Sequence, residues 1–275
     1  MTTETTSALA EAGYRHLLDL LRGMESIAVA CSGGLDSSLL LAAAHQALGE
    51  RVLALTVQTP YMTSHEISEA RTLAAKLGVR HQVLEWPIPE EISHNPPDRC
   101  YRCKRTLFAE LQTIAAAEDY VWLADGTNRD DLDDYRPGMR ALRELGIRSP
   151  LLEAGLGKAE IRRYAQALNL AVWNKPAGAC LLTRLPHGAE ARPELLRRVE
   201  AAEQALLDLG FSAVRVRCHD DLARIEVHRA EHARLLEETI SAQVVAALTA
   251  CGFQHITLDL QGYRMGSFNI TPTAE

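Results

Sequence analysis

The segment AVACSGGLDSS, residues 28–38, constrains the fold more than any other part of this 275-residue chain. A short apolar run of strand type leads directly into two glycines, which let the backbone come close to an anion. The apolar helical pattern that begins at Ser37 would present free backbone N–H groups and a partial positive charge at its start. We therefore expect a strand, a phosphate-binding loop and a helix in direct succession. The alternative is a tight turn in which Asp36 and the serines act only as local caps.

Strand-length apolar runs alternate with helical patterns in the first two thirds of the chain. The runs are IAVACS, VLALTVQT, HQVLEW and YVWLADGT, and helices are predicted at 37–48, 64–77, 101–117 and 158–168. This order predicts βαβ units on a parallel sheet, and therefore the α/β class. We expect this domain to span residues 1–185.

The pattern changes after about residue 193. A helix is predicted at 193–209, followed by the strands AVRVRCH and ARIEVHR, a helix at 231–248 and the strand HITLDLQ. Pro186, Gly188 and Pro193 interrupt regular structure just before this region. We therefore predict a smaller α+β domain over residues 190–275, with roles in substrate binding or oligomerisation.

Composition excludes several classes of protein. The net charge of -7 argues against the broad basic surface that binds a large nucleic acid. No secretory leader and no run of about 18 apolar residues is found. Six scattered cysteines do not suit a secreted disulfide framework. We expect a cytoplasmic protein with no membrane partner.

A second polar patch, ADGTNRDD at residues 124–131, also ends a predicted strand. Ligands bind at the carboxyl ends of parallel strands, so Asp125, Gly126, Thr127 and Asn128 are expected to face a nucleotide. The alternative is a turn in which Asp and Asn cap a helix.

The string Ser-Gly-Gly-x-Asp-Ser after a strand resembles the PP-loop of the ATP pyrophosphatases, over roughly residues 25–180. The resemblance implies a Rossmann-like sheet of the adenine nucleotide alpha hydrolase type, with ATP and Mg2+ bound by it. Asp36 is the candidate residue for Mg2+. The resemblance further implies an ATP site formed by Ala30, Ser32, Gly33, Gly34, Leu35, Asp36, Ser37, Ser38, Val57, Gly126, Thr127 and Asn128.

Three cysteines raise the question of a metal site. Cys100 and Cys103 stand in RCYRCK, and Cys180 stands in KPAGACLLTR. A structural zinc would need a fourth ligand, for which His94 and His187 are candidates. Three thiolates can instead hold a 4Fe-4S cluster and leave one iron free. Cys31, on the strand before the loop, is interpreted as a core residue.

An adenylating loop combined with such cysteines is found in tRNA thiolases and in the LarE family of sulfur transferases. The segments that resemble LarE are NRDDLDDYRPGMRAL, SPLLEAGLGKAEIR, NKPAGACLLTRLPHG, VRVRCHDDLARIEV and LDLQGYRMGSFN. The RNA-binding zinc modules of the thiolases are missing. The resemblance implies ATP-dependent adenylation of pyridinium-3,5-biscarboxylic acid mononucleotide and attack by sulfide. Its thiocarboxylate product leads to the nickel-pincer nucleotide of lactate racemase.

The resemblance also assigns residues. Some members of the family donate the sulfur of one sacrificial cysteine, at the position of Cys180. Because Cys100 and Cys103 accompany it here, we predict a catalytic protein with a 4Fe-4S cluster on these three cysteines and a separate sulfide source. Position-by-position similarity places Arg184 and Glu203 near the substrate and assigns Arg215 and Arg264 to its phosphate; cross-strand ion pairs are the alternative for each arginine. The resemblance further implies a homo-oligomer.

Overall fold

The computed structural model describes residues 8–9, 11–133, 137–175 and 178–263. It divides into two compact units. The first unit comprises Met1–Glu91 and Asp98–Gly178, and the second comprises Ile92–Pro97 and Ala179–Glu275. Among the described residues no helix combines the length and the apolar character that crossing a membrane requires.

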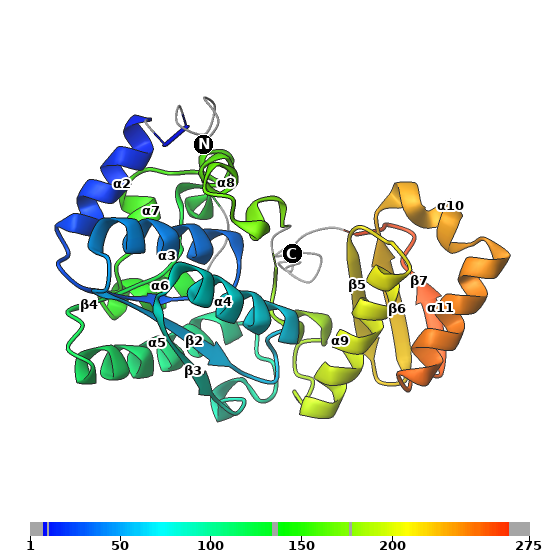
Figure 1. Cartoon of the computed structure of the whole chain (residues 1–275). Coiled ribbons are helices and arrows are strands. Elements are labelled where there is room, and N and C mark those ends of the chain that lie inside the picture. Colours follow the sequence, from blue (N-terminus) through cyan, green and yellow to red (C-terminus); the bar gives the residue numbers. More distant parts are fainter. Residues whose placement is uncertain (1–7, 10, 134–136, 176–177, 264–275) are drawn as a thin grey trace, which may run out of the picture. The chain divides into compact units, whose positions relative to one another are not determined.

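The first unit contains a four-stranded sheet (Figure 1). Its order is β3-β2-β1-β4, and the three strand pairs are all parallel. The strands are β1 (Ile27–Ala30), β2 (Val52–Gln58), β3 (Arg80–Glu85) and β4 (Trp122–Ala124). The parallel sheet and the α/β class predicted from the alternating pattern are confirmed.

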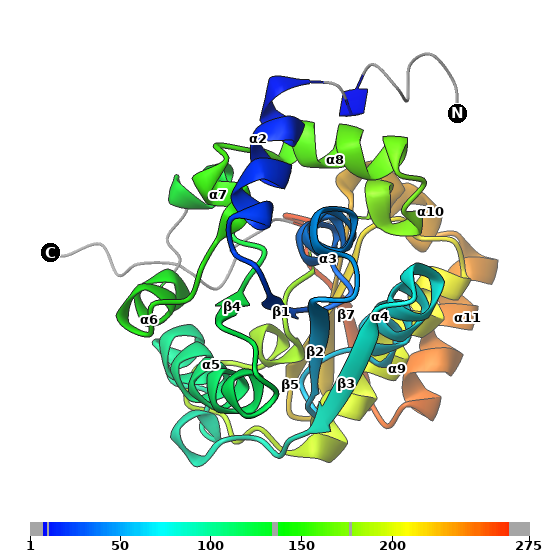
Figure 2. The same cartoon turned by 60° about the vertical axis from the view of Figure 1, so that its left-hand side comes forward.

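Helices cover both faces of this sheet (Figures 1 and 2). Because strand side chains alternate between faces, Val29 and Val52 belong to one core and Ala28 and Leu53 to the other. The first core is completed by α2 (Ala12–Arg22), α3 (Leu35–Leu48), α4 (Ser64–Leu77), α7 (Pro150–Glu153) and α8 (Lys158–Ala167). The second is completed by α5 (Arg99–Ala117) and α6 (Gly138–Glu144).

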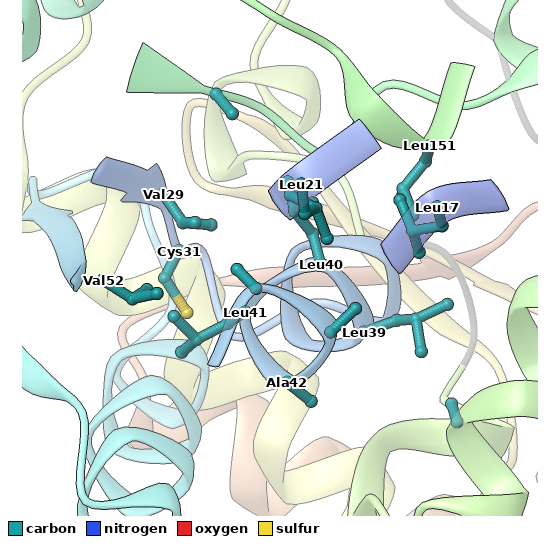
Figure 3. Close-up of a cluster of buried hydrophobic side chains, with 14 of the residues drawn as sticks. Leu17, Leu21, Val29, Cys31, Leu39, Leu40, Leu41, Ala42, Val52 and Leu151 are labelled. Atoms are coloured by element: carbon teal, nitrogen blue, oxygen red, sulfur yellow. The ribbon is translucent and has the colours of Figure 1, made fainter. Parts of the chain in front are cut away.

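Helix α3 is surrounded by other elements, and its surface is apolar on most sides. Leu39, Leu40 and Leu41 are all fully buried, although they point in different directions around the helix (Figure 3). Leu17 and Leu21 of α2 lie against it in the same cluster. A helix that is apolar all round belongs inside a core. The loop that precedes α3 is therefore attached to one of the most buried elements of the unit.

The second unit has a three-stranded sheet of order β5-β6-β7. Strand β5 (Val214–His219) pairs antiparallel with β6 (Leu222–Val227), and β6 pairs parallel with β7 (His255–Leu258). The helices are α9 (Pro193–Asp208), α10 (His232–Leu235) and α11 (Glu238–Ala250). Single 3-10 turns occur at Glu90–Ile92, Arg129–Leu132, Ala171–Asn174, Leu181–Arg184 and Arg229–Glu231.

The single helix predicted at 231–248 is wrong. The structure has α10 and α11 in its place, separated at Leu236 and Glu237. Glu237 has an extended backbone, with φ −59° and ψ 134°, and a new helix starts after it. No glycine or proline marks this break in the sequence.

Candidate active site

The strand order places a topological switch point at the carboxyl end of β1. The chain leaves β1 toward β2 and β3 on one side and returns to the other side of β1 with β4. In parallel sheets, ligands bind where the direction of winding reverses in this way. The glycine loop follows β1 and the polar patch follows β4, so both predicted segments lie at this switch point.

The loop after β1 has a conformation that only glycine allows at its centre. Gly33 has φ +74°, and a Cβ atom there would lie 2.1 Å from the carbonyl oxygen of Glu66. The Ser37 hydroxyl accepts a hydrogen bond from Ser32 N–H at 3.2 Å and donates to Gly34 O at 3.2 Å. Gly34 precedes α3 with no capping side chain among the described residues. The loop is thus held by hydrogen bonds among its own residues, and the backbone N–H groups at the start of α3 remain available to a phosphate.

The loop after β4 packs directly on this loop. A Cβ atom at Gly126 would lie 2.9 Å from the backbone nitrogen of Ser37 and 3.1 Å from Asp36 atoms. Asp125 is buried and accepts hydrogen bonds from the Thr127 hydroxyl at 2.6 Å and the Ser149 hydroxyl at 2.7 Å. The structure therefore brings Gly126 together with Asp36 and Ser37.

The side chains of Thr127 and Asn128 form hydrogen bonds with neighbouring residues of the same loop. Thr127 donates to Asp125, and Asn128 caps the turn Arg129–Leu132 by accepting from Asp130 N–H at 3.0 Å. Both residues are buried. For Asn128 the capping interpretation describes the geometry, so any contact with a nucleotide would fall to the backbone of this loop.

The other predicted ATP-site residues contribute backbone or packing. Ala30 ends β1, Leu35 and Ser38 are buried at the start of α3, and Val57 is buried on β2 in the core beneath α5. Ser32 is exposed next to Gly33. Ser32, Gly34 and Asp36 are therefore the residues of this loop and helix start that are at least partly exposed.

Two lysines that the sequence did not single out reach this site. The Lys158 ammonium contacts the Asp36 carboxylate, from the first residue of α8. Lys104, the residue after Cys103 on α5, lies 3.5 Å from the Asp125 carboxylate. Both lysines are partly exposed. Lys158 stands at the start of a predicted helix in GLGKAEIR, but no local pattern indicates that it reaches a loop 122 residues away.

The cysteines are distributed over both units. Cys100 and Cys103 lie on the first two turns of α5, where a spacing of three residues places side chains on one face. Cys100 is exposed, and Cys103 Sγ is hydrogen-bonded to the Tyr61 hydroxyl at 3.3 Å. Cys180 belongs to the second unit, directly before the turn Leu181–Arg184, and is partly exposed. Within the described ranges, no three His, Cys, Asp or Glu side chains are assembled as a metal site.

Cys31 is a core residue, as predicted. Only 2% of it is exposed, and its thiol lies near Val29, Val52 and Leu41 (Figure 3). Burial raises the pKa of Cys31 by disfavouring the thiolate. Cys31 is therefore unlike Cys100, Cys103 and Cys180, which are partly or fully exposed.

In the part of the second unit that the structure describes, Arg184 and Arg217 form ion pairs with carboxylates, whereas Arg215 does not. Arg184 pairs with Glu203, and Arg217 pairs with Glu226. Burial lowers the pKa of Arg184, but its hydrogen bonds to Glu203 and the attraction of nearby negative charge, Glu203 above all, together outweigh this and raise the pKa overall. Arg215 has no carboxylate within ion-pair distance among the described residues, and it stacks on Tyr263 at 5.1 Å. Arg264 lies outside the described residues.

The surroundings of Arg215 suit an anion. Burial lowers the pKa of Arg215, and the positive charges of Arg184 and Arg217 lower it further, while the Glu203 carboxylate partly offsets this. A partly buried cation near other cations is stabilised by a bound negative charge.

Comparison with known proteins places this geometry in a family. The family model described as queuosine biosynthesis protein QueC matches residues 26–97. The tRNA-specific 2-thiouridylase of Rickettsia peacockii is 26% identical over 58% of the chain and 54% of its own length. An uncharacterized protein of Synechocystis is 38% identical over 95% of the chain and 98% of its own length. The pyridinium-3,5-bisthiocarboxylic acid mononucleotide synthase of Lactiplantibacillus plantarum is 38% identical over 94% of both chains. This chain is therefore an enzyme that belongs to the family of that synthase, the LarE family of PP-loop proteins.

Proposed function

We propose that the protein is an ATP-dependent sulfur transferase that converts the carboxylates of pyridinium-3,5-biscarboxylic acid mononucleotide to thiocarboxylates. ATP adenylates a carboxylate with release of pyrophosphate, sulfide attacks the acyl adenylate, and AMP leaves. Repetition gives the bisthiocarboxylic acid, a precursor of the nickel-pincer nucleotide of lactate racemase. The observation that supports this proposal best is the phosphate loop after β1, found in a chain that is 38% identical to the Lactiplantibacillus synthase over 94% of both lengths.

The first unit carries out adenylation in this proposal. The backbone around Gly33 and Gly34, with the Ser32 hydroxyl, holds the pyrophosphate that leaves. Mg2+ prefers carboxylate oxygens, and carboxylates are supplied by Asp36 at the start of α3 and by Asp125 directly after β4. Lys158 and Lys104 then add positive charge where phosphate oxygens accumulate.

Cys100, Cys103 and Cys180 would hold a 4Fe-4S cluster. Their chemistry fits, since all three are thiols outside the buried core, and two lie at the start of α5, where negative charge is favoured. Such a cluster supplies a fourth iron that protein ligands leave open to sulfide. Cys180 as a sacrificial sulfur donor is the alternative within the same reaction.

The second unit would bind the substrate phosphate through Arg215 and Arg264. Arg215 is the better supported of the two because it is partly buried near Arg184 and Arg217, with no carboxylate within ion-pair distance among the described residues. A guanidinium binds phosphate through parallel hydrogen bonds. A small substrate also agrees with the net charge of -7, whereas tRNA, the substrate class named for the Rickettsia relative, would require a basic surface. A cytoplasmic homo-oligomer supplied by a separate sulfide source completes the proposal.

Lys158→Met is expected to raise the KM for ATP about tenfold or more, because it removes a positive charge next to the phosphate loop. The matched control is Lys76→Met, which changes an exposed lysine of α4 that donates to Asn169 O. Pyrophosphate release at varied ATP concentration measures the effect. Equal KM values for Lys158→Met and Lys76→Met would show that Lys158 only neutralises Asp36.

The direct test of the function is the formation of thiocarboxylate from the biscarboxylic mononucleotide by the anaerobic protein, followed by mass spectrometry.

A further inference from the structure

The residues after Cys180 form one 3-10 turn, Leu181–Arg184, whose hydrogen bonds converge on the cysteine carbonyl. Cys180 O accepts from Thr183 N–H at 3.0 Å and from the Thr183 hydroxyl at 2.8 Å. A single 3-10 turn has few and poorly aligned hydrogen bonds, so it holds one conformation only with outside support. Two buried guanidinium groups provide that support within the second unit.

The first guanidinium is that of Arg184. Its Nη1 donates to Ala179 O at 2.6 Å, to Cys180 O at 3.2 Å and to the Thr183 hydroxyl at 2.8 Å. Its Nε and Nη2 both donate to Glu203, each at 2.9 Å. The Arg184 side chain is 3% exposed, and Glu203 is tied to β5 by accepting Val216 N–H at 2.9 Å. All three nitrogens of this guanidinium are thus engaged inside the unit.

The second guanidinium is that of Arg217 on β5. Its Nη1 donates to Thr183 O at 2.6 Å, so it contacts the other end of the turn. Its Nε and Nη2 both donate to Glu226 of β6, each at 2.8 Å. Glu226 is 1% exposed and also pairs with Arg224. Arg217 is therefore held by the sheet itself.

We propose that Arg184 and Arg217 are positioning residues for Cys180. Two buried pairs, Arg184–Glu203 and Arg217–Glu226, fix the carbonyl groups on both sides of the turn and so hold the cysteine in one orientation. The planar fork of arginine makes this possible, because it binds a carboxylate with two nitrogens and a backbone carbonyl with the third. The role of Cys180 in sulfur transfer rests on the proposed function, whereas its positioning rests on these contacts alone.

The test uses Arg184→Lys and Arg217→Lys in the full chain. An ammonium keeps the charge but loses the fork, so the turn loses its attachment to the carbonyl groups. Alkylation of the metal-free protein by iodoacetamide is followed at each cysteine by peptide mass spectrometry. We expect the rate at Cys180 to change by about threefold or more, with Cys100 and Cys251 in the same sample unchanged. Arg197→Lys, which alters an exposed arginine of α9, is the matched control.

Sulfur transfer supplies the second measurement. Both lysine variants are expected to lower kcat about tenfold or more with little change in the KM for the mononucleotide, since a displaced reactive group impairs the reaction more than binding. Thr183→Val removes the two hydrogen bonds of the Thr183 hydroxyl, to Cys180 O and from Arg184 Nη1, and should shift Cys180 alkylation in the same direction if a lysine variant fails to fold. Unchanged Cys180 alkylation in the folded variants overturns the proposal, and a raised KM alone would assign Arg184 to the substrate. If the wild type transfers no sulfur, the proposed function fails, and the alkylation rates still decide the positioning role.

Discussion

Cys103→Ala is expected to lose the iron of the anaerobically purified protein and all turnovers after the first, while ATP binding survives. The wild type should contain about four irons per chain and a brown chromophore, as a 4Fe-4S cluster requires. Removing one of three thiolates leaves two, which are too few to hold the cluster. ATP binding should persist because the phosphate loop belongs to β1 and α3, whereas Cys103 lies on α5. Iron analysis, the visible spectrum and ATP titration measure the three effects.

Cys100→Ala should behave in the same way. The control is Cys251→Ala, since Cys251 is a partly exposed cysteine that the proposal does not use. Stoichiometric zinc in the wild type, with sulfur transfer intact, would contradict the cluster and favour a structural metal site.

Gly33→Ala is expected to weaken ATP binding by about 100-fold or more. The new Cβ would lie 2.1 Å from the Glu66 carbonyl oxygen, which is backbone of α4 and cannot move aside by rotating a side chain. The positive φ of Gly33 adds about 1–3 kcal/mol of backbone strain. The loop must therefore shift away from the geometry that positions a phosphate. Isothermal titration with ATP measures the loss.

The matched control for this change is Gly78→Ala. Gly78 has φ +69° at the end of α4, and a Cβ atom there meets nothing within 4 Å. This variant bears the backbone strain without the clash, so it should lose stability but retain ATP affinity. Similar affinities of Gly33→Ala and the wild type for ATP would show that the loop does not contribute to the nucleotide site.

Elements with local signals were predicted well from the sequence. Helix α4 runs from Ser64 to Leu77, as predicted, because Thr63 caps its start and Gly78 ends it in a left-handed conformation. The succession of a strand, a glycine loop and a helix around residues 27–48 could also be predicted, since the glycines and serines of the loop act through backbone geometry within a few residues. The break at Glu237 was missed because its residues are compatible with a continuous helix.

Contacts between segments that lie far apart in the chain could not be predicted from the sequence. The ion pair of Lys158 with Asp36 joins residues 122 positions apart, and only the packing of α8 against α3 creates it. The segment Ile92–Pro97 belongs to the second unit. There Asn95 donates to the carbonyl groups of Leu182, Leu185 and Pro186.

The thiolation assay tests the central claim most directly. The anaerobic protein is incubated with ATP, Mg2+, sulfide and pyridinium-3,5-biscarboxylic acid mononucleotide, and the products are followed by mass spectrometry. The account predicts mono- and then bisthiocarboxylate, with AMP and pyrophosphate, over several turnovers per chain and with the Cys180 sulfur retained. One product per chain with loss of the Cys180 sulfur would make the protein a sacrificial donor. No thiocarboxylate with this substrate would contradict the proposed function.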